Sequence, residues 1–156
     1  MDTKAEIAAG ETFIKTLPQV RDFALIGSAS YLPDANDVDF AVLIDDFDSG
    51  GAVDYASKLV MDGWGNCGEY DGVGGIWAAV RRENLNLMVT HDTKFFADYK
   101  TAMEVCKALH LTNKQDRIAV CQIVRDGKKA DEVLTHAKLY GSPWPPAPTA
   151  GELAAA

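Results

Sequence analysis

The sequence predicts an α/β (α+β) fold in which a mixed β-sheet is flanked by α-helices. Helical and strand patterns are mixed along the 156 residues, and two adjacent antiparallel strands lie in the middle of the chain. One strand, at residues 37–44, is as apolar as a strand covered on both faces. The elements do not alternate regularly enough for a doubly wound Rossmann fold.

The first elements are a helix and two strands. Residues 2–17 are expected to form a helix, because apolar residues recur at helical spacing and Pro18 follows as a stop. Residues 23–26 (FALI) are expected to form a short buried strand that ends at Gly27. Residues 37–44 (DVDFAVLI) are the clearest strand, alternating at the start and then continuously apolar.

A helix is expected over residues 53–61. The residues expected on its inner side are Val53, Ala56, Leu59 and Val60. Residues 62–75 hold six of the thirteen glycines and are expected to form a flexible loop. Residues 76–81 and 85–90 predict two strands joined in a hairpin by Arg82-Glu83-Asn84.

Helices follow the hairpin. Thr93 is expected to cap a helix that runs to about Leu109. Its apolar stripe is Phe96, Tyr99, Met103 and Cys106. Asn113 is expected to cap another helix. The residues expected to face inward from that helix are Ile118, Cys121 and Val124. A short helix is expected at 130–139.

The domain organisation follows from these patterns. Residues 1–140 are expected to form a single domain, and 141–156 a flexible tail rich in Pro and Ala. Trp144 in that tail is expected to dock on the body of the protein, with docking on a partner as the alternative.

Composition and charge exclude several classes of function. The net charge of −8 argues against a broad basic face for duplex DNA. No apolar run is long enough to span a membrane and the N-terminus lacks a secretory pattern, so a cytoplasmic location is expected. The three cysteines have neither disulfide nor zinc spacing, and Cys106 and Cys121 are expected to fill helix cores.

Two carboxylates at the start of the central strand are the main candidate site. Side chains alternate along a strand, so Asp37 and Asp39 are expected on the same face. Their mutual repulsion would be relieved by a divalent cation, and oxygen ligands of this kind suit Mg²⁺ or Mn²⁺. The alternative to a metal site is that Asp37 and Asp39 are ordinary polar residues where a strand begins at the edge of the sheet.

A glycine turn lies just upstream of the carboxylates. Gly27 at a strand end allows close approach of the backbone to a ligand. Ser28 then opens a turn whose backbone N–H groups and hydroxyl suit phosphate. The combination favours phosphoryl transfer, where positioning and charge neutralisation dominate catalysis.

The run Leu25-Ile26-Gly27-Ser28, eight residues, then Asp37-Val38-Asp39-Phe40 resembles the signature of the DNA polymerase β-like nucleotidyltransferase superfamily. The resemblance covers roughly residues 5–125. The stretch 86–124, with Asn-Lys-x-Asp-Arg at 113–117, looks most like the small stand-alone members found in tailed bacteriophages.

The resemblance implies a nucleotidyltransferase-like fold and transfer of an NMP from an NTP, such as ATP, to an acceptor. Gly27 and Ser28 match the triphosphate-binding turn, and Asp37 and Asp39 match the metal ligands and catalytic pair. The acceptor, whether RNA, a protein or a small molecule, is not identified. Asn86 stands where the family carries a third carboxylate, so activation of the acceptor hydroxyl is in doubt, and Asp92 is not expected to substitute for it.

Positive charge for a triphosphate is expected from Lys114 and Arg117, one helical turn apart. Lys94 and Lys107 are further candidates. For each of these side chains the alternative is a solvated or paired cation, with Asp116 and Glu104 as partners.

Other signals are set aside. Residues 63–68 match G-x-G-x-x-G but lack the strand before and helix after that dinucleotide binding needs. Asp45, Asp46 and Asp48 are interpreted as an acidic loop. Trp64 and Trp77 are interpreted as core or loop anchors.

Two functions therefore remain. The first is a metal-dependent nucleotidyltransferase. The second is a protein of the same fold, catalytically weak or inactive, that acts as a nucleotide-binding or protein-interaction module. A carboxylate beside Asp39 would favour the enzyme, and Asn86 alone in that place would favour the binding protein.

Overall fold

The computed structural model describes residues 2–45, 51–70, 75–125, 135 and 139. The chain divides into two compact units, Met1–Lys100 and Thr101–Ala156. The predicted tail at 141–156, with Trp144, lies outside the described residues, as does nearly all of the helix predicted at 130–139. A single domain over 1–140 therefore stays a prediction.

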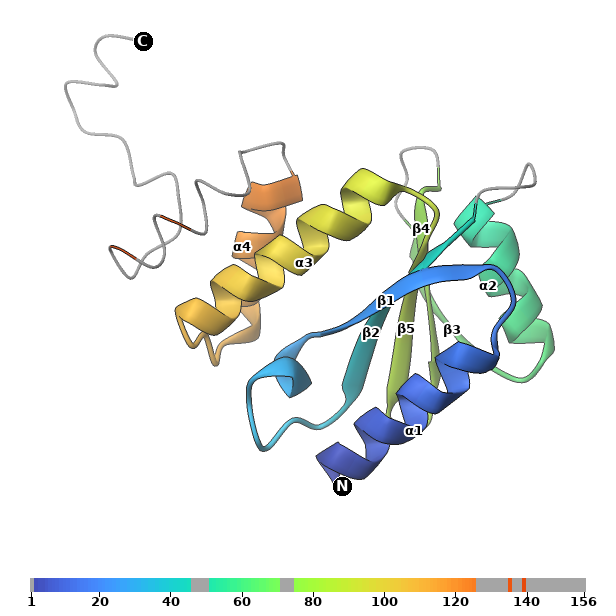
Figure 1. The fold of residues 1–156 in the computed structure, drawn as a ribbon, viewed down its shortest axis with the longest axis horizontal. Coiled ribbons are helices and arrows are strands. Elements are labelled where there is room, and N and C mark those ends of the chain that lie inside the picture. Colours follow the sequence, from blue (N-terminus) through green and yellow to red (C-terminus); the bar gives the residue numbers. More distant parts are fainter. Residues whose placement is uncertain (1, 46–50, 71–74, 126–134, 136–138, 140–156) are drawn as a thin grey trace, which may run out of the picture. The chain divides into compact units, whose positions relative to one another are not determined.

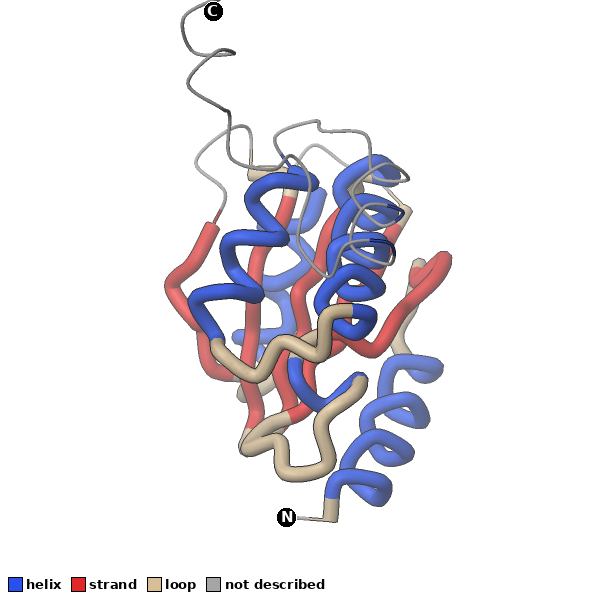
Figure 2. The backbone as a smooth tube through the Cα atoms, turned by 90° about the vertical axis from the view of Figure 1, so that its left-hand side faces the viewer, coloured by secondary structure: helices blue, strands red, loops and turns tan. Residues whose placement is uncertain are grey.

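The first unit is built on a five-stranded mixed sheet in the order β1-β2-β5-β4-β3 (Figures 1 and 2). The strands are β1 (Val20–Ile26), β2 (Val38–Ile44), β3 (Gly65–Tyr70), β4 (Trp77–Arg82) and β5 (Leu85–Thr90). β2 and β5 are parallel, and the other neighbouring pairs are antiparallel. The predicted mixed sheet with flanking helices is confirmed, and the apolar strand β2 lies inside it as expected.

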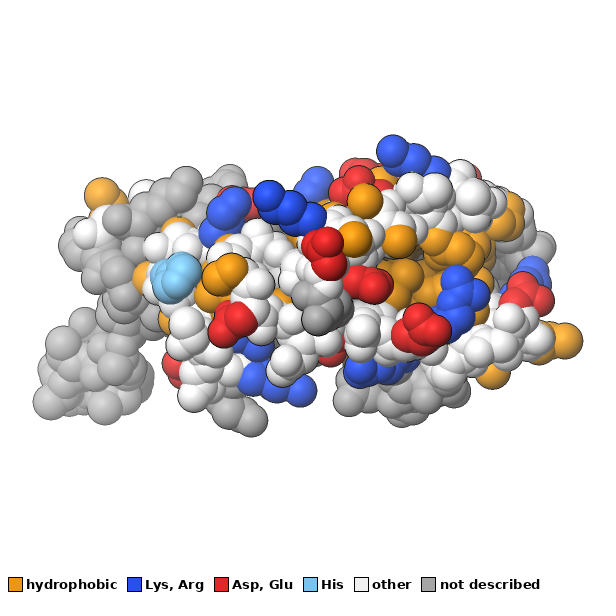
Figure 3. Space-filling model, turned by 90° about the horizontal axis from the view of Figure 1, so that it is seen from below, with side chains coloured by type: hydrophobic (Ala, Val, Ile, Leu, Met, Phe, Trp, Pro, Cys, Tyr) orange, Lys and Arg blue, Asp and Glu red, His pale blue; other side chains and the backbone are white. Residues whose placement is uncertain are grey.

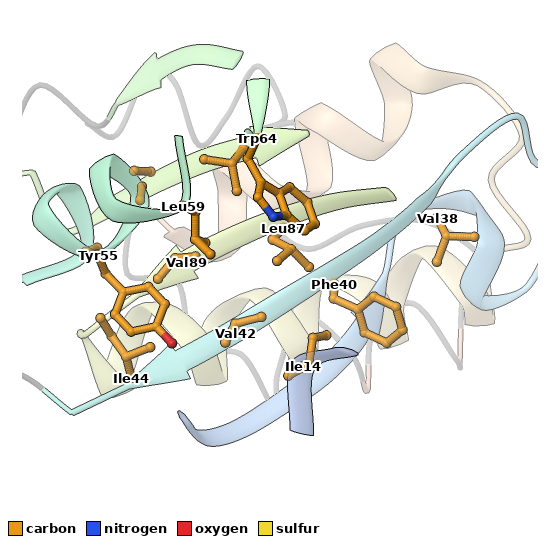
Figure 4. Packing of buried hydrophobic residues seen from close by; sticks show 14 of the residues in the cluster. Ile14, Val38, Phe40, Val42, Ile44, Tyr55, Leu59, Trp64, Leu87 and Val89 are labelled. Atoms are coloured by element: carbon orange, nitrogen blue, oxygen red, sulfur yellow. The ribbon is translucent and has the colours of Figure 1, made fainter. Parts of the chain in front are cut away.

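Helices α1 (Thr3–Thr16) and α2 (Gly51–Met61) share one hydrophobic core with the sheet. Figure 4 shows this core. Val38, Phe40, Val42 and Ile44 of β2 contribute to it with Leu87 and Val89 of β5, Ile14 of α1, and Tyr55 and Leu59 of α2. We call this side of the sheet the core face.

Alternation sends the intervening side chains to the opposite side, which we call the second face. Asp39 of β2, Asn86 of β5 and Arg81 of β4 belong to it, because their sequence neighbours Phe40, Leu87 and Val80 lie in the core. The sheet thus separates an apolar side from a side that carries polar groups at one end.

Helix α3 (Thr93–Ala108) follows β5 and runs across the division between the units. Its N-cap is Asp92, whose carboxylate accepts from the Phe95 amide at 2.7 Å, so the expectation that Thr93 caps the helix is wrong. The Asp92 carboxylate, one residue before Thr93, is placed to accept from the backbone amide three residues farther along the chain. In the first unit, the Phe95 ring stacks on Trp77 with centroids 6.2 Å apart.

The second unit contains the end of α3 and helix α4 (Lys114–Arg125). Cys106 and Cys121 are both buried, as predicted, and neither forms a disulfide. A hydrogen bond with Cys121 and burial raise the pKa of the Cys106 thiol. Val124 is buried as expected, but Ile118 is 49% exposed, and Val120 lies inward instead.

Two further expectations need correction. Residues 65–70 form β3 instead of a flexible loop, because antiparallel pairing with β4 gives this glycine-rich segment the backbone partners that its own sequence does not signal. On α2, Val60 is 37% exposed, and Ala52 and Tyr55 are buried beside Ala56 and Leu59. Within the described residues, no helix has the length and apolar character needed to cross a membrane.

Tyr55 supports a prediction about stability at high pH. Its hydroxyl donates to the Pro18 carbonyl oxygen at 2.6 Å, and burial raises the pKa of Tyr55 from 10.0 to about 12. Because the folded pKa lies above the unfolded one, this phenol favours the folded state below about pH 10 and loses that effect as the pH rises to about 12.

We expect Tyr55→Phe to lower the free energy of unfolding at pH 7 by about 1 kcal/mol, the net value of one hydrogen bond. The difference between wild type and variant should then shrink as the pH rises above about 10. Urea unfolding of both proteins across this range checks it. A difference that is independent of pH contradicts the assignment.

Candidate functional site

The two predicted carboxylates converge on one side chain of the neighbouring strand. Asp39 and Asn86 are directly paired across β2 and β5, and Asp37 lies two residues earlier. The Asn86 amide Nδ2 donates to Asp39 Oδ1 at 2.7 Å and to Asp37 Oδ2 at 3.3 Å. Asp37 and Asp39 therefore point to the same side of the sheet, where one amide group relieves their mutual repulsion.

Asn86 lies beside Asp39, at the position where the resemblance to the nucleotidyltransferase superfamily implies a third carboxylate. Its Oδ1 is buried and has no hydrogen-bond partner in the part of the chain that the structure describes. An amide can donate and accept but cannot take up a proton at neutral pH. Asp92 lies six residues farther along, past the end of β5, where its carboxylate caps α3.

Arg81 is a site residue that sequence reasoning missed. It is paired with Asn86 across β4 and β5, and its Nη1 lies 3.7 Å from Asp37 Oδ2. Its Nε donates to the Glu83 carbonyl oxygen at 2.9 Å, which fixes the guanidinium beside the turn. The signal lies in the length of the hairpin turn: a turn of Glu83 and Asn84 alone puts Arg81 opposite Asn86, whereas the predicted three-residue turn does not.

Gly27, the residue directly after β1, lies against the Asp39 carboxylate. Its φ of +69° and ψ of −168° fall in a region that is essentially restricted to glycine. A Cβ atom at this position would lie 2.4 Å from Asp39 Oδ2. Ser28 begins the short 3-10 helix η1 (Ser28–Ser30), and the Ser30 hydroxyl donates to the Gly27 carbonyl oxygen at 2.7 Å. The glycine turn thus packs directly against a carboxylate of the pair.

Of the cations predicted to bind phosphate, only Lys94 belongs to the same unit as the carboxylates. Lys94 pairs with Asp98 on α3, and this hydrogen bond raises the pKa of Lys94. Lys107, Lys114 and Arg117 belong to the second unit, where Arg117 Nη1 donates to the Thr112 carbonyl oxygen at 3.2 Å. Contact of Lys114 and Arg117 with phosphate stays a prediction.

On the face in Figure 3, acidic and basic side chains are interspersed, with apolar side chains between them. Among the described side chains that this view shows, the basic residues do not merge into one broad surface.

The donor set at the site suits a small, hard cation. Asp37 and Asp39 supply carboxylate oxygens, and Mg²⁺ or Mn²⁺ takes few oxygen ligands from protein and the rest from water or phosphate. Asn86 presents its Nδ2 to the carboxylates, so its Oδ1 would become a ligand only after rotation of the amide. No group of three or more His, Cys, Asp or Glu side chains suited to a metal occurs among the described residues. The residues therefore fit an oxygen-bound cation completed by a ligand.

The sequence features to which no function was assigned have structural explanations. Residues 63–68 follow α2 and run into β3, the opposite of the strand-to-helix order of a dinucleotide site. Asp45 pairs with Arg21 at 3.3 Å on the surface, and Asp46 and Asp48 lie outside the described residues. Trp64 is 3% exposed in the core, and Trp77 packs on Phe95.

The fold is similar to that of a solved structure, the conserved protein GrpB from Enterococcus faecalis. The similarity covers 88% of this chain and 92% of that one, with a TM-score of 0.53 and 15% sequence identity. The similarity shows that the two proteins share a mixed α+β fold. No family model matches the chain, and no curated protein matches it in sequence. The likeness to tailed-phage members stays a prediction.

The contact between Gly27 and Asp39 gives a prediction with an internal control. Gly63 also has a positive φ, +101°, but an added Cβ would meet nothing within 4 Å. We expect Gly63→Ala to cost about 1–2 kcal/mol of stability from backbone strain alone. Gly27→Ala should cost about 1–3 kcal/mol more, because its methyl group overlaps Asp39. Equal losses in chemical denaturation would show that Gly27 does not pack against the carboxylate as described.

Proposed function

We propose that this chain is a metal-dependent nucleotidyltransferase that moves an NMP from an NTP to an acceptor hydroxyl. The observation that carries the proposal is the convergence of Asp37 and Asp39 beside the Gly27 turn. The mixed α+β fold agrees with the nucleotidyltransferase-like fold that the resemblance implies. The acceptor, be it RNA, a protein or a small molecule, and the preferred base remain open to experiment.

The roles of the residues follow from their places. Asp37 and Asp39 would hold Mg²⁺ or Mn²⁺, which supplies neutralisation of phosphate charge when bound. The backbone turn at Gly27 and Ser28 would hold the β and γ phosphates. Asn86 keeps the two carboxylates together, and rotation of its amide would present the buried Oδ1 in place of Nδ2.

A second candidate function, nucleotide binding without transfer, is favoured by Asn86 itself. Among the described residues, the side chain paired with Asp39 on β5 is this amide, which cannot accept a proton from an acceptor. The same site would then serve as a nucleotide sensor or as a module that modulates a partner protein. The two candidates share the ligand and differ in the chemical step.

Thermal unfolding with each NTP and Mn²⁺ tests the shared ligand. A ligand that binds only the folded state at 100 times its Kd adds about 2.7 kcal/mol, which raises Tm by roughly 5–10 °C in a chain of this size. We expect this rise for wild type and its loss in Asp37→Asn/Asp39→Asn. The control Asp45→Asn/Asp62→Asn removes equal charge elsewhere and should keep the rise. No rise with any NTP would remove both nucleotide-binding candidates and would leave a protein-interaction role for the same fold.

Asn86→Asp separates enzyme from binding protein. If the missing carboxylate limits transfer, wild type should release pyrophosphate slowly in the presence of mixed RNA, protein and small hydroxyl acceptors, and the variant should be about 10²-fold faster. Asp39→Asn should abolish release while leaving the circular dichroism spectrum unchanged. If wild type binds NTP but releases no pyrophosphate, the second candidate function, nucleotide binding without transfer, is supported.

A further inference from the structure

Asp37 Oδ2 has two positively polarised neighbours. Asn86 Nδ2 lies 3.3 Å from it, and Arg81 Nη1 lies 3.7 Å from it. Arg81 comes from β4, which borders β5 on the side away from β2. All three side chains come from adjacent positions of β4, β5 and the start of β2. Asp37 therefore meets a cation of the protein as well as the amide that it shares with Asp39.

The position of Arg81 is set by the backbone. The β4–β5 register places it opposite Asn86, and its Nε is hydrogen-bonded to the Glu83 carbonyl oxygen at 2.9 Å. Glu83 itself adopts a φ of +54°, as the tight turn requires. A guanidinium stays charged at all ordinary pH values, so this positive charge is permanent.

The charges limit how many divalent cations the site can hold. Asp37 and Asp39 contribute two negative charges, Arg81 one positive charge and Asn86 none, so these four side chains, taken by themselves, carry a net charge of about −1. One divalent cation brings the group to about +1, whereas two bring it to about +3. Two divalent cations at a two-metal spacing also repel each other about four times as strongly as unit charges.

We propose that this site binds a single divalent cation, and that Arg81 together with Asn86 takes the place of a second. This inference rests on the proposed metal site at Asp37 and Asp39. It assigns Arg81 as a positioning and charge-balancing residue, and it makes the number of bound cations a property of two side chains on neighbouring strands. Replacing both with groups that favour cations should create a second site.

The test is Mn²⁺ alone, titrated into the full chain and followed by the electron paramagnetic resonance signal of free Mn²⁺. Wild type is expected to bind one Mn²⁺ per chain. Arg81→Gln/Asn86→Asp should bind two, or bind the first at least about tenfold more tightly, because the net charge of the group falls from about −1 to about −3. Calorimetric unfolding of each protein confirms that it is folded during the titration.

Arg82→Gln is the matched control. Arg82 is the next residue on β4, but its guanidinium lies over the Phe13 and Trp64 rings, 4.8 and 4.5 Å from their centroids, on the core face. Its replacement removes one positive charge, as the Arg81→Gln half of the test variant does, and should change neither the number of bound Mn²⁺ ions nor their affinity beyond about twofold.

The outcomes separate this inference from the proposed function. Two Mn²⁺ per wild-type chain, both lost in Asp37→Asn/Asp39→Asn, would overturn the single-cation inference and keep the metal site. One Mn²⁺ with unchanged number and affinity in Arg81→Gln/Asn86→Asp would also overturn the inference. A wild type that binds no Mn²⁺, or binds it equally well without Asp37 and Asp39, would remove the metal site itself.

Discussion

The parallel register between β2 and β5 places Asn86 opposite Asp39, and the candidate site depends on that pairing. Because side chains alternate along a strand, a shift of one residue would bring an apolar neighbour, Leu85 or Leu87, to the carboxylates and turn Asn86 into the core. The core prevents that shift, since Leu87 and Val89 of β5 are fully buried with Phe40 and Val42 of β2. Hydrophobic packing on one face therefore fixes polar geometry on the other.

Much of this arrangement could be predicted from the sequence, because strong periodicity and glycine both have local causes. The apolar run in 37–44 identified an internal strand, and the carboxylate spacing put Asp37 and Asp39 on one face. Gly27 was singled out for close approach of the backbone to a ligand, which stays a prediction; the structure shows that a Cβ atom there would overlap Asp39. Asn86 was expected beside the pair because the family resemblance implies a third carboxylate at that position, and it is paired with Asp39.

The missed features depend on pairing, which the local pattern does not encode. Strand β3 is glycine-rich and is defined by its hydrogen bonds with β4. Arg81 reaches the site only because the hairpin turn is one residue shorter than predicted, which moves every β4 residue by one position against β5. The exposure of Val60 and Ile118 likewise depends on neighbouring elements. The N-cap at Asp92 is instead a local contact with Phe95, one residue before the predicted cap. Sequence periodicity indicates which residues form an element, and tertiary contacts decide its register.

The central claim is that Asp37, Asp39 and Asn86 form one cation-responsive group. Nuclear magnetic resonance of the Asn86 side-chain amide during a Mg²⁺ titration tests it most directly, with the signal assigned by its loss in Asn86→Asp. We expect the Asn86 side-chain amide to shift most, followed by the Gly27 backbone amide, because the Asn86 amide donates to both carboxylates and Gly27 packs against one of them. Shifts confined to exposed acidic residues such as Asp45 and Asp62, with Asn86 and Gly27 unchanged, would contradict the account.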